Sequence, residues 1–503
     1  MNKDVGNTVD EQIVLSKEQF ETLNLQNEKL LSENEYLKQQ LDELKRLIFG
    51  SKSERFVPNS SDAQQYSLFE TEAEPAEEQV EEIAYSRKKA EKKKQKAIRA
   101  KIPAHLPRVE EIIEPDIIED GSKKIGEEIT EVLEYTPGNM HVRKIIRPKY
   151  ARPKGEGVDI AELPSLPIPK GNAGASLLAF IMVSKFVDHL PYYRQIQIFK
   201  RQGLTISDST INGWFNATAK LLEPLYDTLE KQILQSDYIQ ADESPIGVQD
   251  SHKKGALHSG YQWVYRSPLQ RLVLFKYHTG RGQEAPKEVL NEFFGALQTD
   301  GYQAYKNMAV NGQIIHLACM AHARRYFDKA LKNDQKRAEH VLKLMQRLYE
   351  IERKARERTV SFKIRYRYRQ IYAKPILQEL EEWLIKNQLQ TTPQSAIGKA
   401  IAYTTNLWPK LKVYIDGGEY EIDNNLIENA IRPLALGRKN YLFAGSHKAA
   451  QHAAMFYSFF ATCKINNIEP LAWLTDVLNR IQEHKVNKLN ELLPQNWQPN
   501  IPQ

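Results

Sequence analysis

The sequence predicts a multidomain α+β protein in which a mixed β-sheet carries packed helices, and three observations support this fold class. The chain has 503 residues, which is too long for one hydrophobic core and indicates about three or four domains. Between positions 236 and 318, three strand-like segments are followed by a helical segment and one more apolar strand. Helical periodicity dominates before and after this region, so we expect helices to pack on the sheet.

Composition and charge restrict the class of protein. A net charge of +6 and a pI near 8.8 are compatible with nucleic acid as a partner. The two cysteines, Cys319 and Cys463, provide no disulfide framework. The first twelve residues lack the apolar core of a signal peptide, and the longest strongly apolar run, 177–183, is far shorter than the roughly 20 residues of a membrane span. We therefore expect a cytoplasmic protein without a membrane segment.

Residues 1–56 are predicted to form a coiled-coil dimerisation segment. Apolar and asparagine side chains recur with a heptad spacing, Glu and Lys fill the flanks, and neither Gly nor Pro interrupts the pattern between residue 20 and Gly50. The two seam positions are Leu23, Leu30, Leu37 and Leu44, and Phe20, Asn27, Asn34, Leu41 and Ile48. The pattern predicts a homodimer or higher oligomer, and the alternative is a helix that packs on its own chain.

The next two segments separate this helix from the main body of the chain. Residues 57–104 form a charged linker, acidic at first and basic between 87 and 101, which is either a solvated spacer or a contact to DNA phosphates. Residues 105–165 contain short β-like pieces such as "EEITEVLEYTP" and "MHVRKIIRPKYA", separated by Gly and Pro turns.

Residues 166–232 are predicted to be a helical region that resembles a helix-turn-helix. The stretch "LPYYRQIQIFKRQGLTISDSTINGWFNATAKLL" has helix, glycine-centred turn and helix in succession. Ser207 is a plausible N-cap of the second helix, and we expect Trp214 and Phe215 in the core. The motif predicts a DNA-binding region, although the same pattern also occurs in helices that only pack.

The remaining chain divides around the sheet. We expect its first part at 233–330, a helical insertion at 331–409, a return to the sheet domain at 410–446 and a helical C-terminal region at 447–503. The insertion contains the basic and aromatic run "KIRYRYRQIY".

Three acidic residues are candidates for a metal site. Asp242 and Asp300, 58 positions apart, each end a predicted strand, and Glu428 lies on a helix that could pack across the sheet. Three carboxylates can hold two divalent cations about 3.5–4 Å apart, and all-oxygen ligands favour Mg²⁺ or Mn²⁺. From the residues alone, two simpler roles stay open: a turn-forming role for each aspartate, and a surface ion pair between Glu428 and Arg432.

Four motifs resemble those of the transposases of the insertion-sequence-66 family. They are "ADESP" at 241–245, "LQTDGYQAY" at 297–305, "CMAHARRYF" at 319–327 and "IDNNLIENAIRPLALGRKNYLFAGS" at 422–446. The N-terminal heptads with "RLIFGSKSER", the helix-turn-helix stretch and the C-terminal tail are similar to that family too. The resemblance implies a DDE-type enzyme with a ribonuclease-H-like core, whose catalytic and metal-binding residues are Asp242, Asp300 and Glu428.

The resemblance also suggests roles for the neighbours of Glu428. Asn424 and Asn425 are expected to cap its helix, and Pro433 to end or kink that helix. DNA phosphates are expected to contact Arg432, Arg438 and Lys439, and more broadly the basic segments 87–101, 362–369 and 432–439.

One departure from the family concerns zinc. A four-cysteine, zinc-ribbon-like element is common in the family, but the matching stretches "IIEDGSKKIGEE" and "YARPKGEG" contain no cysteine, so we expect no zinc there. His316, Cys319 and His322 lack a fourth ligand, and we expect His322 to support the active site instead.

The expected function is metal-dependent cleavage of DNA ends followed by strand transfer, with two Mg²⁺ or Mn²⁺ ions as cofactors. The implied partners are inverted-repeat transposon ends, target DNA and accessory proteins of the same element. Two alternatives are a degenerate transposase that acts as a DNA-binding regulator and a ribonuclease-H-like nuclease without strand transfer.

Overall fold

A computed structural model describes residues 165–169, 171–250, 256–309 and 314–499, a short ribbon at 149–151 and 158–160, and a few isolated residues before it. The predicted coiled coil, the charged linker and most of 105–165 lie outside the described residues. The chain forms two compact units: residues 65–163 make up one, and all elements from α2 onward belong to the other. No helix in the described part of the chain is both long and apolar enough to cross a membrane.

The ribbon of the smaller unit consists of β1 (Lys149–Ala151) and β2 (Val158–Ile160). The strands are antiparallel, with Tyr150 opposite Asp159.

A mixed sheet lies at the centre of the larger unit. Its strands are β3 (Tyr238–Gln249), β4 (Leu257–Ser267), β5 (Leu272–His278), β6 (Gly295–Thr299) and β7 (Ile314–Ala318), in the order β5-β4-β3-β6-β7. Strand β4 is antiparallel to both of its neighbours, β3 and β5, whereas β6 runs parallel to β3 and β7 runs parallel to β6. The predicted mixed sheet is therefore confirmed. The expectation that Asp242 ends its strand is wrong, because pairing with β4 continues the strand to Gln249.

Three helices precede the sheet: α2 (Ala175–Phe186), α3 (Tyr192–Arg201) and α4 (Asp208–Leu234). Gly203 takes a positive φ of +84° in the turn between α3 and α4, which a residue with a side chain rarely adopts. The Ser207 side chain accepts a hydrogen bond from the Thr210 N–H at 3.1 Å and so caps α4, as predicted. Trp214 and Phe215 are buried, again as predicted.

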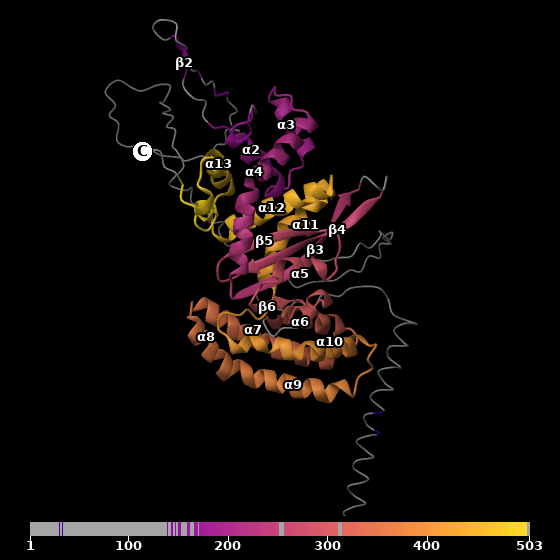
Figure 1. The fold of residues 1–503 in the computed structure, drawn as a ribbon. Coiled ribbons are helices and arrows are strands. Elements are labelled where there is room, and N and C mark those ends of the chain that lie inside the picture. Colours follow the sequence, from indigo (N-terminus) through magenta and orange to yellow (C-terminus); the bar gives the residue numbers. More distant parts are fainter. Residues whose placement is uncertain are drawn as a thin grey trace, which may run out of the picture. The chain divides into compact units, whose positions relative to one another are not determined.

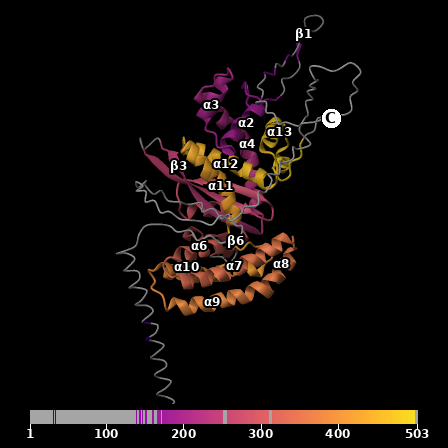
Figure 2. The same cartoon turned by 180° about the vertical axis from the view of Figure 1, so that it is seen from behind.

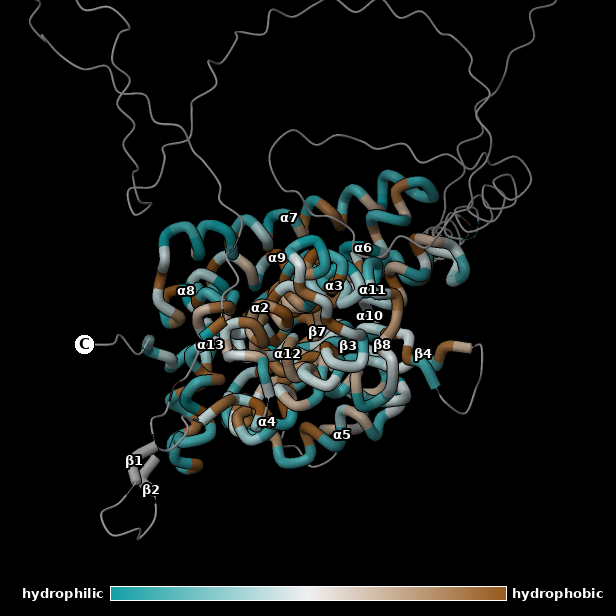
Figure 3. Tube along the Cα trace, turned by 90° about the horizontal axis from the view of Figure 1, so that it is seen from above, coloured by the Kyte–Doolittle hydropathy of each residue, from teal (hydrophilic) through white to brown (hydrophobic). Residues whose placement is uncertain are grey.

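The open edge of β5 is covered by α12 (His447–Ile465). The Thr462 and Ser458 hydroxyls accept hydrogen bonds from the backbone N–H groups of Val273 and Phe275, at 3.1 and 2.8 Å. A helix thus satisfies strand groups that would otherwise offer a pairing edge. Helix α13 (Pro470–Arg480) and the 3₁₀ turn η5 (Val486–Leu492) then pack against α2 and α4, and hydrophobic segments gather inside this unit (Figure 3).

A helical bundle lies on the β6–β7 side of the sheet, opposite α2, α4 and α13 (Figures 1 and 2). Its second hydrophobic core joins residues of β6 and β7 to those of four bundle helices. The helical segments after β5 are α5 (Glu284–Leu290), η2 (Gln303–Ala309), α6 (Met320–Ala330), α7 (Gln335–Glu357), α8 (Phe362–Tyr368), the π-helical turn η3 (Arg369–Ala373), α9 (Lys374–Gln388), α10 (Ala396–Leu411) and η4 (Val413–Asp416).

The chain returns to the sheet through α11 (Asn425–Tyr441), which packs on β3 and β4. Of the two outcomes expected at Pro433, an end of the helix is contradicted, because the helix continues for two further turns to Tyr441. The short strand β8 (Phe443–Ala444) follows and pairs with the end of β3.

Candidate active site

The strand register brings Asp242 and Asp300 to neighbouring positions. Tyr238, Ile239 and Gln240 of β3 pair in parallel with Ala296, Leu297 and Gln298 of β6. Two residues beyond this pairing, Asp242 and Asp300 occupy equivalent positions on the two strands. The Asp300 carboxylate accepts a hydrogen bond from the Tyr302 N–H at 2.8 Å, and its backbone oxygen accepts one from the Tyr403 hydroxyl at 2.6 Å.

Glu428 faces the same place from the first turn of α11. Its carboxylate lies 3.7 Å from the Arg325 guanidinium of α6 and is about one-fifth exposed. Burial raises the pKa of Glu428, Arg325 opposes this change, and the carboxylates of Asp423 and Asp300 add to it. The acids of β3, of the end of β6 and of α11 are thus near enough for their charges to influence one another.

Like charges make this arrangement unfavourable without a cation. Burial raises the pKa of Asp242 well above its usual range, and the negative charges of Glu243, Asp300 and Glu428 raise it further. Among the described residues, no three His, Cys, Asp or Glu side chains are already placed to hold one metal ion. The donors are nevertheless all oxygens with mutual repulsion, which is the chemistry that suits hard divalent cations.

Buried amide side chains of the sheet hold the loop before Glu428. The Gln240 side chain donates to the Asp423 backbone oxygen at 2.9 Å, and Gln298 donates to that of Glu421 at 2.9 Å. Tyr238 accepts from the Glu421 N–H at 3.1 Å and donates to Gln298. Because all three side chains are fully buried, this network fixes the position of the loop before α11 relative to the sheet.

The predicted capping of α11 by the two asparagines is wrong. Asn424 occupies the N-cap position, but its side chain makes no capping hydrogen bond and instead donates to the Ala241 backbone oxygen at 3.3 Å. The Asp423 carboxylate accepts from the backbone and side-chain N–H groups of Asn425, at 3.0 and 2.9 Å. A carboxylate in this place suits the positive end of the helix better than an amide, while Asn424 ties α11 to the residue before Asp242.

One basic side chain of α11 bonds to the sheet, and two others are exposed to solvent. Arg438 donates to the Ser244 hydroxyl at 3.2 Å and to the Pro245 backbone oxygen, so it anchors the helix to β3. The prediction that Arg438 faces DNA phosphates does not agree with these bonds. Arg432 and Lys439 are exposed.

Two arginines of the basic run in the insertion are buried. Arg365 and Arg369 both bind the Glu352 carboxylate of α7, with contacts of 2.7–2.8 Å, and Arg365 also binds Glu421 through two hydrogen bonds of 2.9 Å. Contrary to expectation, residues 362–369 are therefore not uniformly a contact surface for DNA. This ion cluster joins the bundle to the same loop that the sheet glutamines hold.

Sequence reasoning did not identify Glu243 and Arg325. Glu243 is 7% exposed and binds Arg281 through hydrogen bonds of 2.9 and 2.6 Å, on the strand position next to Asp242. The second acid in "ADESP" and the arginine pair in "AHARRYF" were the available signals. His322 lies near Asp300 and Arg325: burial and Arg325 lower its pKa, and Asp300 opposes them.

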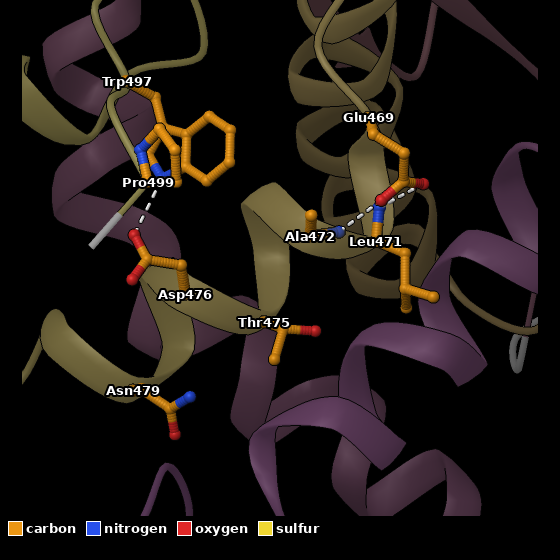
Figure 4. A pocket seen from close by; sticks show the side chains of 8 residues that line it. All are labelled: Glu469, Leu471, Ala472, Thr475, Asp476, Asn479, Trp497 and Pro499. Atoms are coloured by element: carbon orange, nitrogen blue, oxygen red, sulfur yellow. Dashed lines mark hydrogen bonds between the residues drawn. The ribbon is translucent and has the colours of Figure 1, made fainter. Parts of the chain in front are cut away.

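A shallow pocket elsewhere is separate from these acids (Figure 4). It is formed by α13, the residue before it and the C-terminal stretch after η5. Its two carboxylates are engaged: Glu469 accepts from the Leu471 N–H at 3.0 Å, and Asp476 accepts from Trp497 at 2.7 Å. The pocket therefore offers no free acid or base for chemistry.

Comparisons with known proteins cover almost the whole chain. The family described as "Transposase IS66 family" matches residues 170–452, "IS66 C-terminal element" matches 458–495, and "Transposase C of IS166 homeodomain" matches 36–110. Relatives in Sinorhizobium fredii include the uncharacterized protein y4jD, which is 34% identical over 90% of this chain and 93% of its own length. The uncharacterized proteins y4hP and y4qI of the same organism are 30% and 31% identical, over 92% and 91% of this chain and 88% of each relative.

Proposed function

The chain belongs to the IS66 family of transposases, and on that premise we propose that it cleaves the DNA ends of an insertion sequence and joins them to target DNA. The convergence of Asp242, Asp300 and Glu428 from three elements is the observation that supports this proposal. The sheet order, with three antiparallel strands followed by two parallel ones, supports a ribonuclease-H-like core.

Asp242, Asp300 and Glu428 would hold two Mg²⁺ or Mn²⁺ ions. When bound, the ions would supply charge stabilisation for both the attacking and the leaving oxygen of a phosphodiester. The three carboxylates provide oxygen donors from rigid elements, and the buried amides of the sheet fix the approach of Glu428. Preorganisation of this kind limits the rearrangement required at the moment of reaction.

The proposed chemistry consists of two in-line phosphoryl transfers at one site. In the first, a water oxygen attacks the phosphodiester at the element end, the P–O bond to the neighbouring nucleotide breaks, and a 3′-hydroxyl leaves. In the second, that hydroxyl attacks a phosphodiester of target DNA and releases a new 3′-hydroxyl. Arg325, 3.7 Å from Glu428, lies where it can donate to a non-bridging phosphate oxygen.

DNA is the proposed partner of the surfaces next to this site. The exposed first turn of α4 after the Gly203 turn provides short polar side chains for contacts to bases or sugar-phosphate. Exposed Arg432 and Lys439 on α11 would bind phosphates. Because the chain belongs to this family, we also propose accessory proteins encoded by the same element as partners.

Substitution of each acid tests the proposed function. Asp242→Asn, Asp300→Asn and Glu428→Gln keep side-chain size but remove charge, and each should lower end cleavage and strand transfer in Mg²⁺ at least about a hundredfold. The losses should not add, because the three residues act as a unit.

Asp416→Asn, at an exposed acid of η4, is the matched control and should keep full activity. Circular dichroism and a DNA-shift assay on the same preparations check folding and binding. A folded variant of any of the three acids that cleaves at the wild-type rate would remove that residue from the proposed site. Cleavage without joining in the wild-type protein would favour a nuclease over a transposase.

A further inference from the structure

Five large apolar side chains project from α8 and the π-helical turn after it. We call this surface the α8 ridge, and its members are Phe362 (53% exposed), Ile364 (41%), Tyr366 (41%), Ile371 (61%) and Tyr372 (56%). Three of the five are aromatic, and Tyr372 makes an edge contact with Tyr368 at 6.0 Å between ring centroids. So many exposed rings within eleven residues indicate an interaction surface.

The buried ion cluster fixes the direction in which this ridge points. Arg365 and Arg369 are four residues apart and both reach inward to Glu352, with Arg369 fully buried. Arg369 also donates to the backbone oxygens of Tyr414 and Tyr420, at 2.7 and 2.8 Å. These bonds hold the two arginines inside, whereas the five apolar side chains of the same segment stay exposed.

The charge around the ridge selects its partner. Residues 358–378 contain six Lys or Arg and no Asp or Glu. Of these cations, Lys363, Arg367 and Lys374 are exposed beside the rings. Two nearby acids form ion pairs at 3.2 Å: Glu357 with Arg353 and Glu379 with Arg347. Two others, Asp416 at the end of η4 and Glu419 after it, belong to the stretch next to Phe362.

We propose that the α8 ridge binds unpaired nucleotides of the DNA substrate, with bases stacked on Tyr366, Tyr372 and Phe362 and phosphates bound by Lys363, Arg367 and Lys374. This inference rests on the proposed function and specifies the form of DNA that the insertion receives. Flat rings interleaved with cations match a single strand, because stacking tolerates any base and the cations follow its backbone. A second copy of this chain would instead bring the same positive ridge against it.

The segment that carries the ridge is also bonded to the loop before α11. Arg365 binds Glu421, and only three residues separate Glu421 from the start of α11. The four residue steps from Glu421 to Asn425 span at most about 13 Å at roughly 3.3 Å per residue. The segment that carries the ridge is thus bonded to the loop that leads to Glu428.

Binding of a labelled 20-nucleotide oligo-dT to the full-length protein tests the proposal. Tyr366→Ser and Tyr372→Ser should each weaken this binding about five- to a hundredfold, and affinity for a 20-base-pair duplex should change little. Tyr366→Phe should restore binding, because the ring is kept. Arg367→Gln should reduce the slope of the log affinity against log salt by about one.

Leu389→Ser, at an apolar residue that is 82% exposed just after α9, is the surface control and should bind oligo-dT like the wild type. Unchanged oligo-dT affinity in both tyrosine variants would overturn the proposal. So would a lower solution mass at unchanged affinity, because the ridge would then be an interface between copies. Asp300→Asn separates the two proposals: it should bind oligo-dT normally and fail to cleave.

Discussion

Asn424 links the helix that bears Glu428 to the strand that bears Asp242. Its side chain is fully buried, and its amide donates to the Ala241 backbone oxygen at 3.3 Å. Its backbone N–H contacts the Cys319 sulfur at 3.2 Å, at the junction of β7 and α6. A single side chain thus positions elements that are about 180 residues apart in the chain, between residues 241 and 424.

We predict that Asn424→Ala lowers activity more than its effect on folding explains. The change removes the hydrogen bond from Asn424 to the buried Ala241 oxygen and should lower the free energy of unfolding by about 1–3 kcal/mol. It should also lower the end-cleavage rate at temperatures where the protein stays folded, because Glu428 loses its support. Urea unfolding and cleavage assays measure the two effects, with Asn440→Ala on the same helix as a control. Normal cleavage in folded Asn424→Ala would assign the residue to stability alone.

Individual residues differ in how far the sequence predicts their roles. Ser207 was identifiable as a cap because it is the first of a run of polar residues between a glycine-centred turn and a periodic helix. In the run from Asp423 to Asn425, three adjacent side chains all have capping chemistry. Which of them bonds to the helix depends on how the fold positions the loop, and here it is Asp423. The inward direction of Arg438 likewise depends on β3, which no local pattern reveals.

At the scale of elements, the ion cluster ties α7, α8 and the loop before α11 into one unit. Burial alone would raise the pKa of Glu352, but hydrogen bonds from Arg369 and the charges of both arginines hold it below its usual value. The folded carboxylate therefore releases its proton more easily than the unfolded one. The resulting stabilisation is complete above the ordinary glutamate pKa near 4.5 and is lost as the pH falls through the lower folded value.

We predict that Glu352→Gln destabilises the protein by about 3–5 kcal/mol near neutral pH, because it leaves buried guanidinium groups without their anion. Below pH 4.5 the difference from the wild type should shrink. Urea unfolding over a pH series measures both effects. Glu357→Gln, which breaks the exposed pair with Arg353, should change stability by less than about 1 kcal/mol. A constant difference at all pH values would contradict this assignment.

Elements were predictable where periodicity and local turns decide them. The strand pair β4–β5, the strand β7 and the helical insertion follow from such patterns. The length of β3 was not predictable from the sequence. The residues "ESPIGVQ" form a strand because they pair with β4, and they show no regular alternation of apolar and polar residues. The continuation of α11 through Pro433 is also a tertiary effect, since the helix packs on β3 and β4.

At the scale of the whole molecule, the N-terminal heptads are predicted to join subunits. Their leucines bury apolar area only against a partner helix. Deletion of residues 1–50 should therefore lower the solution mass measured by light scattering, while the fold of the remaining chain, followed by circular dichroism, stays intact. An oligomer of unchanged subunit number would place the interface on another surface.

The three acids of the candidate site, widely spaced in sequence, stand in motifs that resemble those of the family. What the sequence did not reveal is how they are held, since Gln240, Gln298 and Arg365 are far apart along the chain and meet only through the fold. Such partners have no common spacing, and each alone resembles an ordinary polar residue.

The pairing of β3 with β6 has a genetic consequence. Adjacent codons specify Asp242 and Glu243; the charge of Asp300 acts on both carboxylates, but the Glu243 side chain is bound to Arg281. A one-codon deletion between Gln240 and Asp242 would rotate the following side chains to opposite faces and present Glu243 in place of Asp242. The reading frame would survive and an acid would still occupy the position, yet Arg281 would lose its partner. We therefore expect a conservative substitution at buried Ala241 to disturb the site less than its deletion.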